Sequence, residues 1–150
     1  MAGSRREGRI LAAQFLYQRE IGVPGVGLEE ALAEFWSLTE AEAEAKAKEF
    51  AEARIRAVVG RQKEVDAELQ KLVTNWEPGR LAPVDRAILR LALWEMKFAE
   101  DVPPIAALNE AIEVAKTLST EESGRFVNGV LDKARANLGR PERTITRSAV

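Results

Sequence analysis

The stretch PVDRAILRLALWEMKFAE, residues 83–100, decides the fold. Its large apolar side chains are spread around nearly the whole circumference of a helix: Val84, Ile88, Leu89, Leu91, Leu93, Trp94, Met96 and Phe98. A helix that is apolar on all sides is buried among other helices. Pro83 also suits the first position of a helix, where its missing N–H is not needed. We therefore expect this segment to form the central helix of the molecule.

Helical periodicity continues on both sides of this segment, and the alternation typical of strands is nearly absent. Ser4 with Glu7, and Thr39 with Glu42, have the spacing of capping boxes that begin helices. Ser119 or Thr120 caps the last helix, which is expected to end at Leu138. The expected helices cover residues 4–21, 28–36, 39–59, 61–73, 83–100, 106–118 and 120–138. The sequence therefore predicts an all-α fold, with a mobile tail at residues 139–150.

The composition excludes several kinds of site. The 150 residues contain no cysteine and no histidine, which removes disulfides, the usual zinc sites, cysteine nucleophiles and histidine bases. Glu110 and Glu113 share a helix, but two carboxylates at this spacing usually form a solvated face, so we expect no metal and no cofactor. The charged N-terminus and the short apolar runs predict a cytoplasmic protein without a membrane span.

The charge is distributed unevenly along the chain. The net charge is −2, yet residues 1–27 carry four basic and two acidic side chains, and residues 120–150 carry six and four. Residues 28–70 carry six basic and eleven acidic side chains. The local distribution, rather than the total, determines where a polyanion can bind. Both basic ends are therefore candidates.

The basic N-terminal end has three arginines on one side of the first expected helix. Arg5, Arg6 and Arg9 fall within about 100° of arc, in line with apolar residues two turns later. We expect these first turns to extend beyond the body and to present guanidiniums, which suit phosphate. The alternative is a solubilising terminus. Tyr17, farther along the helix, either stacks on a base or packs in the core with its hydroxyl at the surface.

The last expected helix contains SGRFVNGVLDK, residues 123–133. Phe126 lies about a right angle away from the centre of the apolar stripe, at the margin of the core. Gly129 lies beside it and leaves the backbone open, between the cations Arg125 and Lys133. This composition suits base stacking with phosphate neutralisation. Geometry alone slightly favours the alternative, in which Phe126 fills a gap at the edge of the core.

The central helix carries its own cations. Arg86 and Arg90 form part of a polar stripe on this helix. We expect them to pair with carboxylates such as Glu95 or Glu110 rather than to contact a ligand.

The order and spacing of several motifs resemble the NusB family of transcription antitermination factors. The matching segments are RREGR at residues 5–9, AAQFLYQ at 12–18, RLAPVDRAILRLALWE at 80–95, VPPIAALNEAIEVAK at 102–116 and SGRFVNGVLDK at 123–133. The resemblance covers about residues 4–138. Two positions depart from it: Glu7 interrupts what can be a longer arginine run, and Pro104 stands where an aromatic residue can occur.

The resemblance implies an all-α, NusB-like fold of about seven helices in two small packed bundles, about 1–75 and 76–138, within one domain at 1–138. It implies a non-enzymatic protein that binds boxA RNA together with NusE, a ribosomal protein of the small subunit. It also implies that the pair joins other Nus factors on RNA polymerase during ribosomal RNA transcription.

The site residues implied by the resemblance fall into two sets. The expected RNA-binding residues are Arg5, Arg6, Arg9, Tyr17, Glu122, Arg125, Phe126, Gly129 and Lys133. The expected NusE-facing residues are Asp85, Trp94, Pro104 and Asn109. With the family in view, Phe126 is expected to face RNA.

Two alternatives to an RNA-binding factor are considered. The first is a helical adaptor that binds only proteins and whose basic ends are solvated. The second is the NusB-like domain of an RNA cytosine methyltransferase, against which the lack of a glycine-rich cofactor loop and of a catalytic cysteine argues. A homodimer formed through an apolar helical face, such as that around Leu93, is a further expectation that the sequence leaves open.

Overall fold

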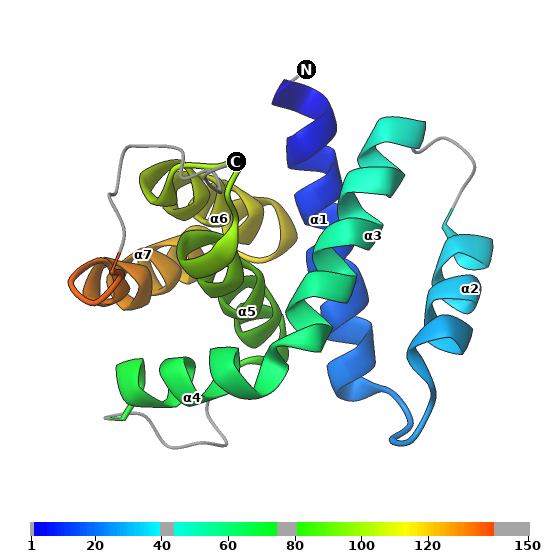
Figure 1. The fold of residues 1–150 in the computed structure, drawn as a ribbon, viewed down its shortest axis with the longest axis horizontal. Coiled ribbons are helices and arrows are strands. Elements are labelled where there is room, and N and C mark those ends of the chain that lie inside the picture. Colours follow the sequence, from blue (N-terminus) through cyan, green and yellow to red (C-terminus); the bar gives the residue numbers. More distant parts are fainter. Residues whose placement is uncertain (1, 40–43, 75–80, 140–150) are drawn as a thin grey trace, which may run out of the picture.

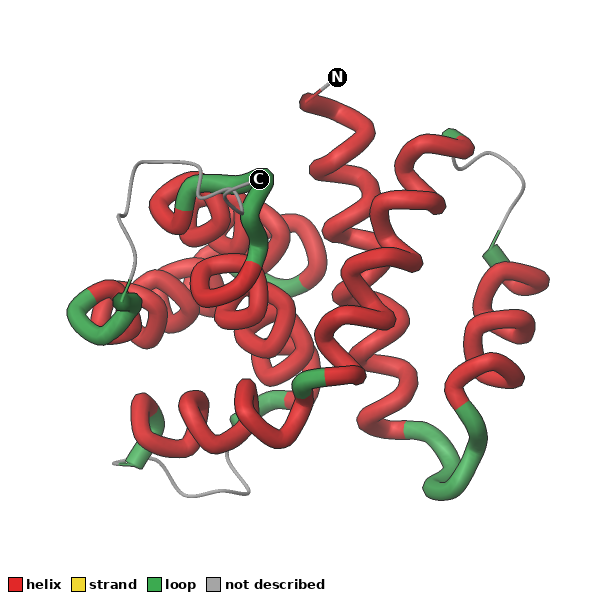
Figure 2. The backbone as a smooth tube through the Cα atoms, in the orientation of Figure 1, coloured by secondary structure: helices red, strands yellow, loops and turns green. Residues whose placement is uncertain are grey.

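A computed structural model describes residues 2–39, 44–74 and 81–139. Within these ranges the chain forms α-helices and connecting loops and no strand, as the sequence predicted (Figures 1 and 2). The helices are α1 (Ala2–Ile21), α2 (Leu28–Leu38), α3 (Ala45–Gly60), α4 (Gln62–Leu72), α5 (Pro83–Phe98), α6 (Pro104–Leu118) and α7 (Glu121–Arg135). The expected tail from residue 140 onward lies outside the described residues.

Two apolar cores share α5. One core joins α1, α2 and α3 to one side of α5, through residues such as Phe15, Leu32, Ile55 and Leu91. The other core joins α4, α6 and α7 to the remaining sides of α5, through residues such as Leu69, Leu93, Val114 and Leu131. The helix expected to be central is therefore in contact with both groups (Figure 1). Helix α4 packs with the second core. The family resemblance implied instead a first bundle that extends to about residue 75.

Helices α1 and α3 run side by side (Figure 1), and a glycine allows their close approach. Gly8 on α1 is buried, and a Cβ atom built there would lie 2.7 Å from Cδ1 of Phe50 and 2.9 Å from the carbonyl oxygen of Ala47. Both distances are shorter than a Cβ atom tolerates. Glycine at position 8 is therefore required by packing between the two helices.

Three of the expected helix ends can be compared with the structure. Thr120 caps α7 as predicted, because its hydroxyl accepts a hydrogen bond from the Ser123 amide at 3.0 Å. The prediction for Ser4 was wrong: α1 begins at Ala2, and the Ser4 hydroxyl donates to Oε2 of Glu44 at 2.8 Å. Thr39 ends α2 rather than beginning α3, and its hydroxyl donates to the Phe35 carbonyl at 2.7 Å. Glu42 lies outside the described residues.

Candidate nucleic-acid interface

A buried ion-pair network lies where α1, α3 and α5 meet. Glu95 on α5 accepts hydrogen bonds from Nε and Nη2 of Arg9 at 2.9 and 3.0 Å, and from Nε of Arg54 at 3.1 Å. The side chains of Arg9 and Glu95 are only 6% and 1% exposed. A buried charge is stable only when it is paired and hydrogen-bonded. The network therefore ties the three helices together in the protein interior.

The ring of Phe50 on α3 completes this network. The Cζ atoms of Arg54, Arg9 and Arg5 lie 4.5, 5.2 and 5.3 Å from its centroid. Guanidinium groups at such distances are attracted to the face of an aromatic ring. Phe50 therefore gathers three cations from two helices around one ring.

The position of Arg9 corrects an expectation. Arg5, Arg6 and Arg9 were expected to extend beyond the body, but Arg9 is buried in the pair with Glu95. Its helical register explains this, since Ala13 and Leu16 lie on the same side of α1 and are buried. Arg9 is therefore not placed to contact RNA directly, whereas Arg5 and Arg6 are exposed.

The two exposed arginines are paired with carboxylates. Arg6 donates from Nε and Nη2 to the two carboxylate oxygens of Glu110 on α6, at 3.1 and 2.6 Å. Arg5 donates to Oδ2 of Asp101 at 3.1 Å, and Asp101 also accepts from Arg54 at 3.0 Å. The hydrogen bond from Arg6 holds the pKa of the Glu110 carboxyl below its ordinary value. The N-terminal cations are therefore largely neutralised within the protein.

Phe126 lies at the margin of the core, as the helical geometry predicted. It is half-buried, packs against the second core, and lines a pocket of about 300 Å³ at the start of α7. Leu81, Asp85, Thr120, Glu122 and Ser123 are among the other residues that line this pocket. The ring therefore packs on the core and also lines this pocket.

The same pocket holds a hydrogen bond between two helices. The Ser123 hydroxyl on α7 donates to Oδ1 of Asp85 on α5. Burial raises the pKa of the Asp85 carboxyl above its ordinary value, and the hydrogen bond from Ser123 acts in the opposite direction. Together with the exposed carboxylate of Glu122, Asp85 gives the pocket an acidic rim.

The remaining α7 candidates are exposed. Arg125, Gly129 and Lys133 all lie at the surface, and no atom approaches within 4 Å of a Cβ atom built on Gly129. Gly129 follows Phe126 by three residues, so the two are neighbours on the helix surface. This part of α7 offers an open backbone beside the ring.

Tyr17 lines a second pocket, on the other side of the first turn of α5. This pocket, of about 590 Å³, is also lined by Gln14, Val84 and Leu118. Tyr17 is half-buried, so the structure places it neither in the closed core nor fully in solvent. Because Val84 and Asp85 are adjacent in the chain, the aromatic pockets of Tyr17 and Phe126 flank the start of α5.

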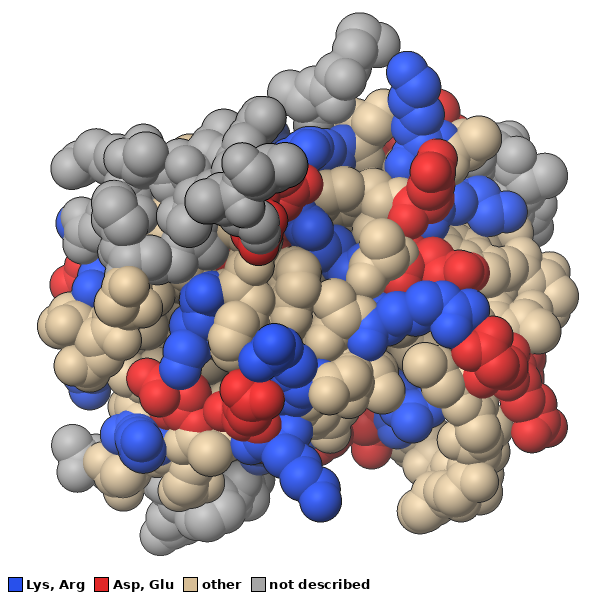
Figure 3. Space-filling view, in the orientation of Figure 1, with Lys and Arg blue, Asp and Glu red and all other residues tan. Residues whose placement is uncertain are grey.

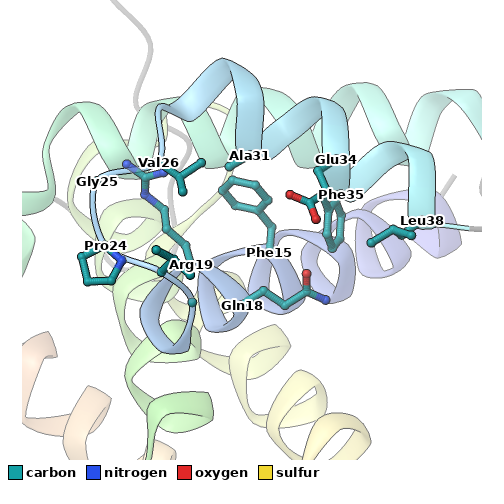
Figure 4. A pocket seen from close by; sticks show the side chains of 12 residues that line it. Phe15, Gln18, Arg19, Pro24, Gly25, Val26, Ala31, Glu34, Phe35 and Leu38 are labelled. Atoms are coloured by element: carbon teal, nitrogen blue, oxygen red, sulfur yellow. The ribbon is translucent and has the colours of Figure 1, made fainter.

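A groove of about 400 Å³ between α1 and α2 adjoins the Tyr17 pocket through shared lining residues. Figure 4 shows the rings of Phe15 and Phe35 between the two helices, with Arg19 toward the loop. Ile21, Val23, Val26 and Leu38 are large apolar side chains exposed in this region. These four are the large apolar side chains that are exposed among the described residues.

The residues expected to face NusE do not lie together. Asp85 lines the Phe126 pocket. Trp94 lies nine residues later on α5, or about two and a half turns, and therefore on the opposite side of the helix. Trp94 contacts both cores, and the Arg54 Cζ lies 5.2 Å from its ring centroid. Pro104 is buried at the start of α6, and Asn109 on the same helix is exposed.

The candidates therefore form two groups. Phe126, Tyr17, Asp85 and Glu122 gather at the start of α5, while Arg5, Arg6, Arg9 and Trp94 gather toward its end, where Asp101 pairs with Arg5. Along α1, Arg6 and Tyr17 are eleven residues apart, or about 16 Å. A ligand that reaches both groups must extend along the molecule.

Basic side chains do not form one continuous patch on the face seen in Figure 3, where Lys and Arg lie next to Asp and Glu. Arg90 on α5, which is buried, is also paired with carboxylates: it donates to Asp66 at 2.8 and 3.1 Å and to Glu20 at 2.8 Å. Arg86 also pairs with Glu20, at 3.4 Å. The expected carboxylate pairing is confirmed, but with partners other than Glu95 and Glu110.

In the ranges that the structure describes, no group of three or more acidic side chains is arranged to hold a metal ion. Among the described helices, none has the length and apolar character needed to cross a membrane.

Sequence reasoning missed Phe50 and Arg54, which are central to the arginine network. Arg54 carried a readable signal, because it shares the helical register of Ala47, Ala51 and Ile55, which are buried. A charged residue in an apolar stripe indicates a buried ion pair. Phe50 offered no comparable signal.

The chain was compared with known proteins. The profile of the NusB family matches residues 6–136. A similar curated protein is the transcription antitermination protein NusB of Methylacidiphilum infernorum (isolate V4), which is 42% identical over 137 residues, or 91% of this chain and 94% of that protein.

Two solved structures are also similar. T. maritima NusB superposes with a TM-score of 0.77 at 35% identity, covering 91% of this chain and 93% of that one. The NusB chain in a crystal structure of the antitermination factors NusB and NusE in complex with dsRNA superposes with a TM-score of 0.74 at 26% identity, covering 89% and 96%. With a family profile that matches most of its length and relatives similar over nearly the whole chain, this protein belongs to the NusB family.

Proposed function

We propose that this chain is a non-catalytic, cytoplasmic transcription antitermination factor. It binds boxA-type single-stranded RNA together with NusE, and with other Nus factors it helps to load the antitermination complex on RNA polymerase during ribosomal RNA transcription. Its family membership supports this proposal, as do the transcription antitermination role in the names of its curated relatives and the NusB–NusE–RNA complex of a structural relative.

The observation that carries the RNA-binding part is the surface of α7 around Phe126. A half-buried ring lines an open pocket, and beside it lie the bare backbone of Gly129 and the exposed cations Arg125 and Lys133. A base can stack on the ring while the cations approach the phosphates. Single-stranded RNA suits this arrangement, because its bases are free to leave the stack.

The other candidates take different roles in the proposal. Arg5 and Arg6 approach phosphates, Tyr17 provides a second aromatic surface, and the Glu122 carboxylate tunes affinity through repulsion. Arg9 acts as a positioning residue, because its guanidinium is held by Glu95 in the interior. Arg9 thus fixes the start of α1 without touching RNA.

NusE is proposed to contact α5 and α6, the helices that carry the expected residues Asp85, Trp94, Pro104 and Asn109, although these four do not lie together. With few phosphate contacts available, binding of RNA to this chain alone is expected to be modest and sensitive to salt. A protein partner that extends the RNA site adds contacts and raises the affinity. NusE is therefore expected to strengthen RNA binding by this chain.

The test is a titration of labelled boxA RNA with this chain, with NusE and with both. We expect weak binding by the chain alone, and tighter binding by the pair than by either protein separately. A scrambled RNA of the same length is the control for sequence preference. Absence of binding by the chain and no gain for the pair over NusE would instead favour the protein-only adaptor. Sedimentation of the chain over a range of concentrations tests the homodimer.

A further inference from the structure

The exposed arginines at the start of α1 are already occupied in the free protein. Nε and Nη2 of Arg6 donate to the two oxygens of Glu110, at 3.1 and 2.6 Å. This two-point geometry is also the one through which arginine binds a phosphate. The Glu110 carboxylate therefore holds the donors that an RNA phosphate would use.

Burial distinguishes this ion pair from its neighbour. The side chains of Arg6 and Glu110 are 51% and 22% exposed, so water and solutes reach the pair. Ion pairs at such exposed sites contribute little stability and exchange readily. The side chains of Arg9 and Glu95 are 6% and 1% exposed, and breaking an ion pair in the interior is costly. Of these two pairs, the one between Arg6 and Glu110 is therefore the one suited to exchange its partner.

Release of Arg6 would not leave Glu110 isolated. Oε1 of Glu110 also lies 3.6 Å from Nη1 of Arg9, so the carboxylate keeps a cation beside it. Asp101, which pairs with Arg5, likewise keeps a second partner, because Arg54 donates to its other oxygen at 3.0 Å. Arg6 differs from Arg5 in pairing through two N–H donors, the geometry that a phosphate also uses.

We propose that Glu110 is an internal competitor of phosphate: it occupies the guanidinium of Arg6 in the free protein and gives it up when RNA binds. The inference rests on the proposed RNA-binding function and adds a regulatory element to it. Each phosphate contact made by Arg6 replaces an existing ion pair, so the affinity for RNA is held below the value that the bare arginines would give.

The first experiment compares RNA binding by four variants with binding by the wild-type protein in the presence of NusE. Glu110→Gln removes the competing charge and keeps the shape of the side chain. Glu64→Gln is the matched control, because Glu64 on α4 forms an exposed pair, at 3.2 Å, with Arg61, the residue that precedes this helix. Arg6→Ala, alone and combined with Glu110→Gln, tests whether the effect passes through Arg6.

We expect Glu110→Gln to bind boxA RNA about two- to five-fold more tightly than the wild type, which is the range corresponding to an exposed ion pair. Glu64→Gln should bind as the wild type does. In the Arg6→Ala background, most of the gain from Glu110→Gln should disappear. Unchanged or weaker binding by Glu110→Gln, an equal gain in Glu64→Gln, or a full gain without Arg6 would each overturn the inference.

A second readout separates this inference from the proposed function. Inorganic tripolyphosphate is titrated into the wild type and Glu110→Gln while the Nε–H signal of Arg6 is followed by NMR. The signal should shift at a lower tripolyphosphate concentration in Glu110→Gln. Equal midpoints would overturn the inference even if RNA binds. If the protein binds no RNA but the midpoints differ, the proposed function fails and the competition stands.

Discussion

Arg9 on α1 and Glu95 on α5 form a two-point ion pair in the protein interior, with N–O distances of 2.9 and 3.0 Å. The residue that continues the exposed arginine run of the sequence is thus directed inward. Arg54 joins the same carboxylate from α3, so one acidic residue connects three helices. This relationship determines which arginines remain available to a ligand.

The Arg9→Ala substitution is expected to destabilise the fold. It leaves the Glu95 carboxylate in the interior with one of its two arginines, and breaking a buried pair costs about 3–5 kcal/mol. The remaining hydrogen bond from Arg54 places the expected loss at the lower end of that range. Urea denaturation measures the free energy of unfolding. Arg5→Ala, at an exposed position of the same helix, is the control, and equal stability of the two variants would contradict this role for Arg9.

Gly8→Ala should weaken the packing of α1 on α3. Its Cβ atom would meet the Phe50 ring at 2.7 Å and the Ala47 carbonyl at 2.9 Å, so the helices must separate. Overpacking of this kind costs about 1–3 kcal/mol. A Cβ atom built on Gly3, on the same helix, has no contact within 4 Å. Gly3→Ala should therefore be neutral or stabilising, because alanine favours a helix. Thermal unfolding compares the stability of the two variants. A Gly8→Ala protein as stable as Gly3→Ala would contradict the close packing of α1 on α3 at Gly8.

Phe126→Ala separates the two roles of this ring. If bases stack on it, RNA affinity should fall by about 1–3 kcal/mol. Because the ring also packs on the second core, some loss of stability is expected as well. Phe98→Ala is a suitable control, since Phe98 is also half-buried but lies at the far end of α5. A folded Phe126→Ala protein that binds RNA with wild-type affinity would show that the ring serves packing alone.

Arg6→Ala should reduce the salt dependence of RNA binding. Loss of one phosphate contact lowers the slope of log K against log salt by about 0.7–1. Arg19→Ala, an exposed arginine at the other end of α1, should leave the slope as it is in the wild type. Binding isotherms at four or more salt concentrations give these slopes. An unchanged slope for Arg6→Ala would argue against a phosphate contact there.

Acid should weaken the ion pair between Arg6 and Glu110. The hydrogen bond from Arg6 lowers the pKa of Glu110 from the ordinary value of 4.5, so the folded state binds this proton less readily than the unfolded state. The resulting stabilisation is fully present above that ordinary value and is lost as the pH falls through the lower pKa of the folded state. Glu110→Gln should therefore lose less stability than the wild type on acidification below about pH 4.5. Chemical denaturation at several pH values measures this loss. An equal loss of stability in the wild type and in Glu110→Gln would contradict the ion pair between Arg6 and Glu110.

The sequence by itself determined the helical fold and the central position of residues 83–100. Both depend on the spacing of apolar side chains along one chain, which sets the face that each helix buries. The same spacing placed Phe126 at the margin of the core, and residue type and position limited the cap of the last helix to Ser119 or Thr120, of which the structure shows Thr120. Even the burial of Arg9 and Arg54 could have been read from their place in apolar stripes.

The tertiary structure alone decided which charges meet. Glu95 lies 86 residues from Arg9, and Glu110 lies 104 residues from Arg6, so no local pattern relates them. It likewise brought Asp85 to Ser123 and to the Phe126 pocket. Helical periodicity fixes the direction of a side chain relative to its own helix, whereas ion pairing depends on how two helices cross. The availability of each arginine to a ligand therefore became visible only in the folded protein.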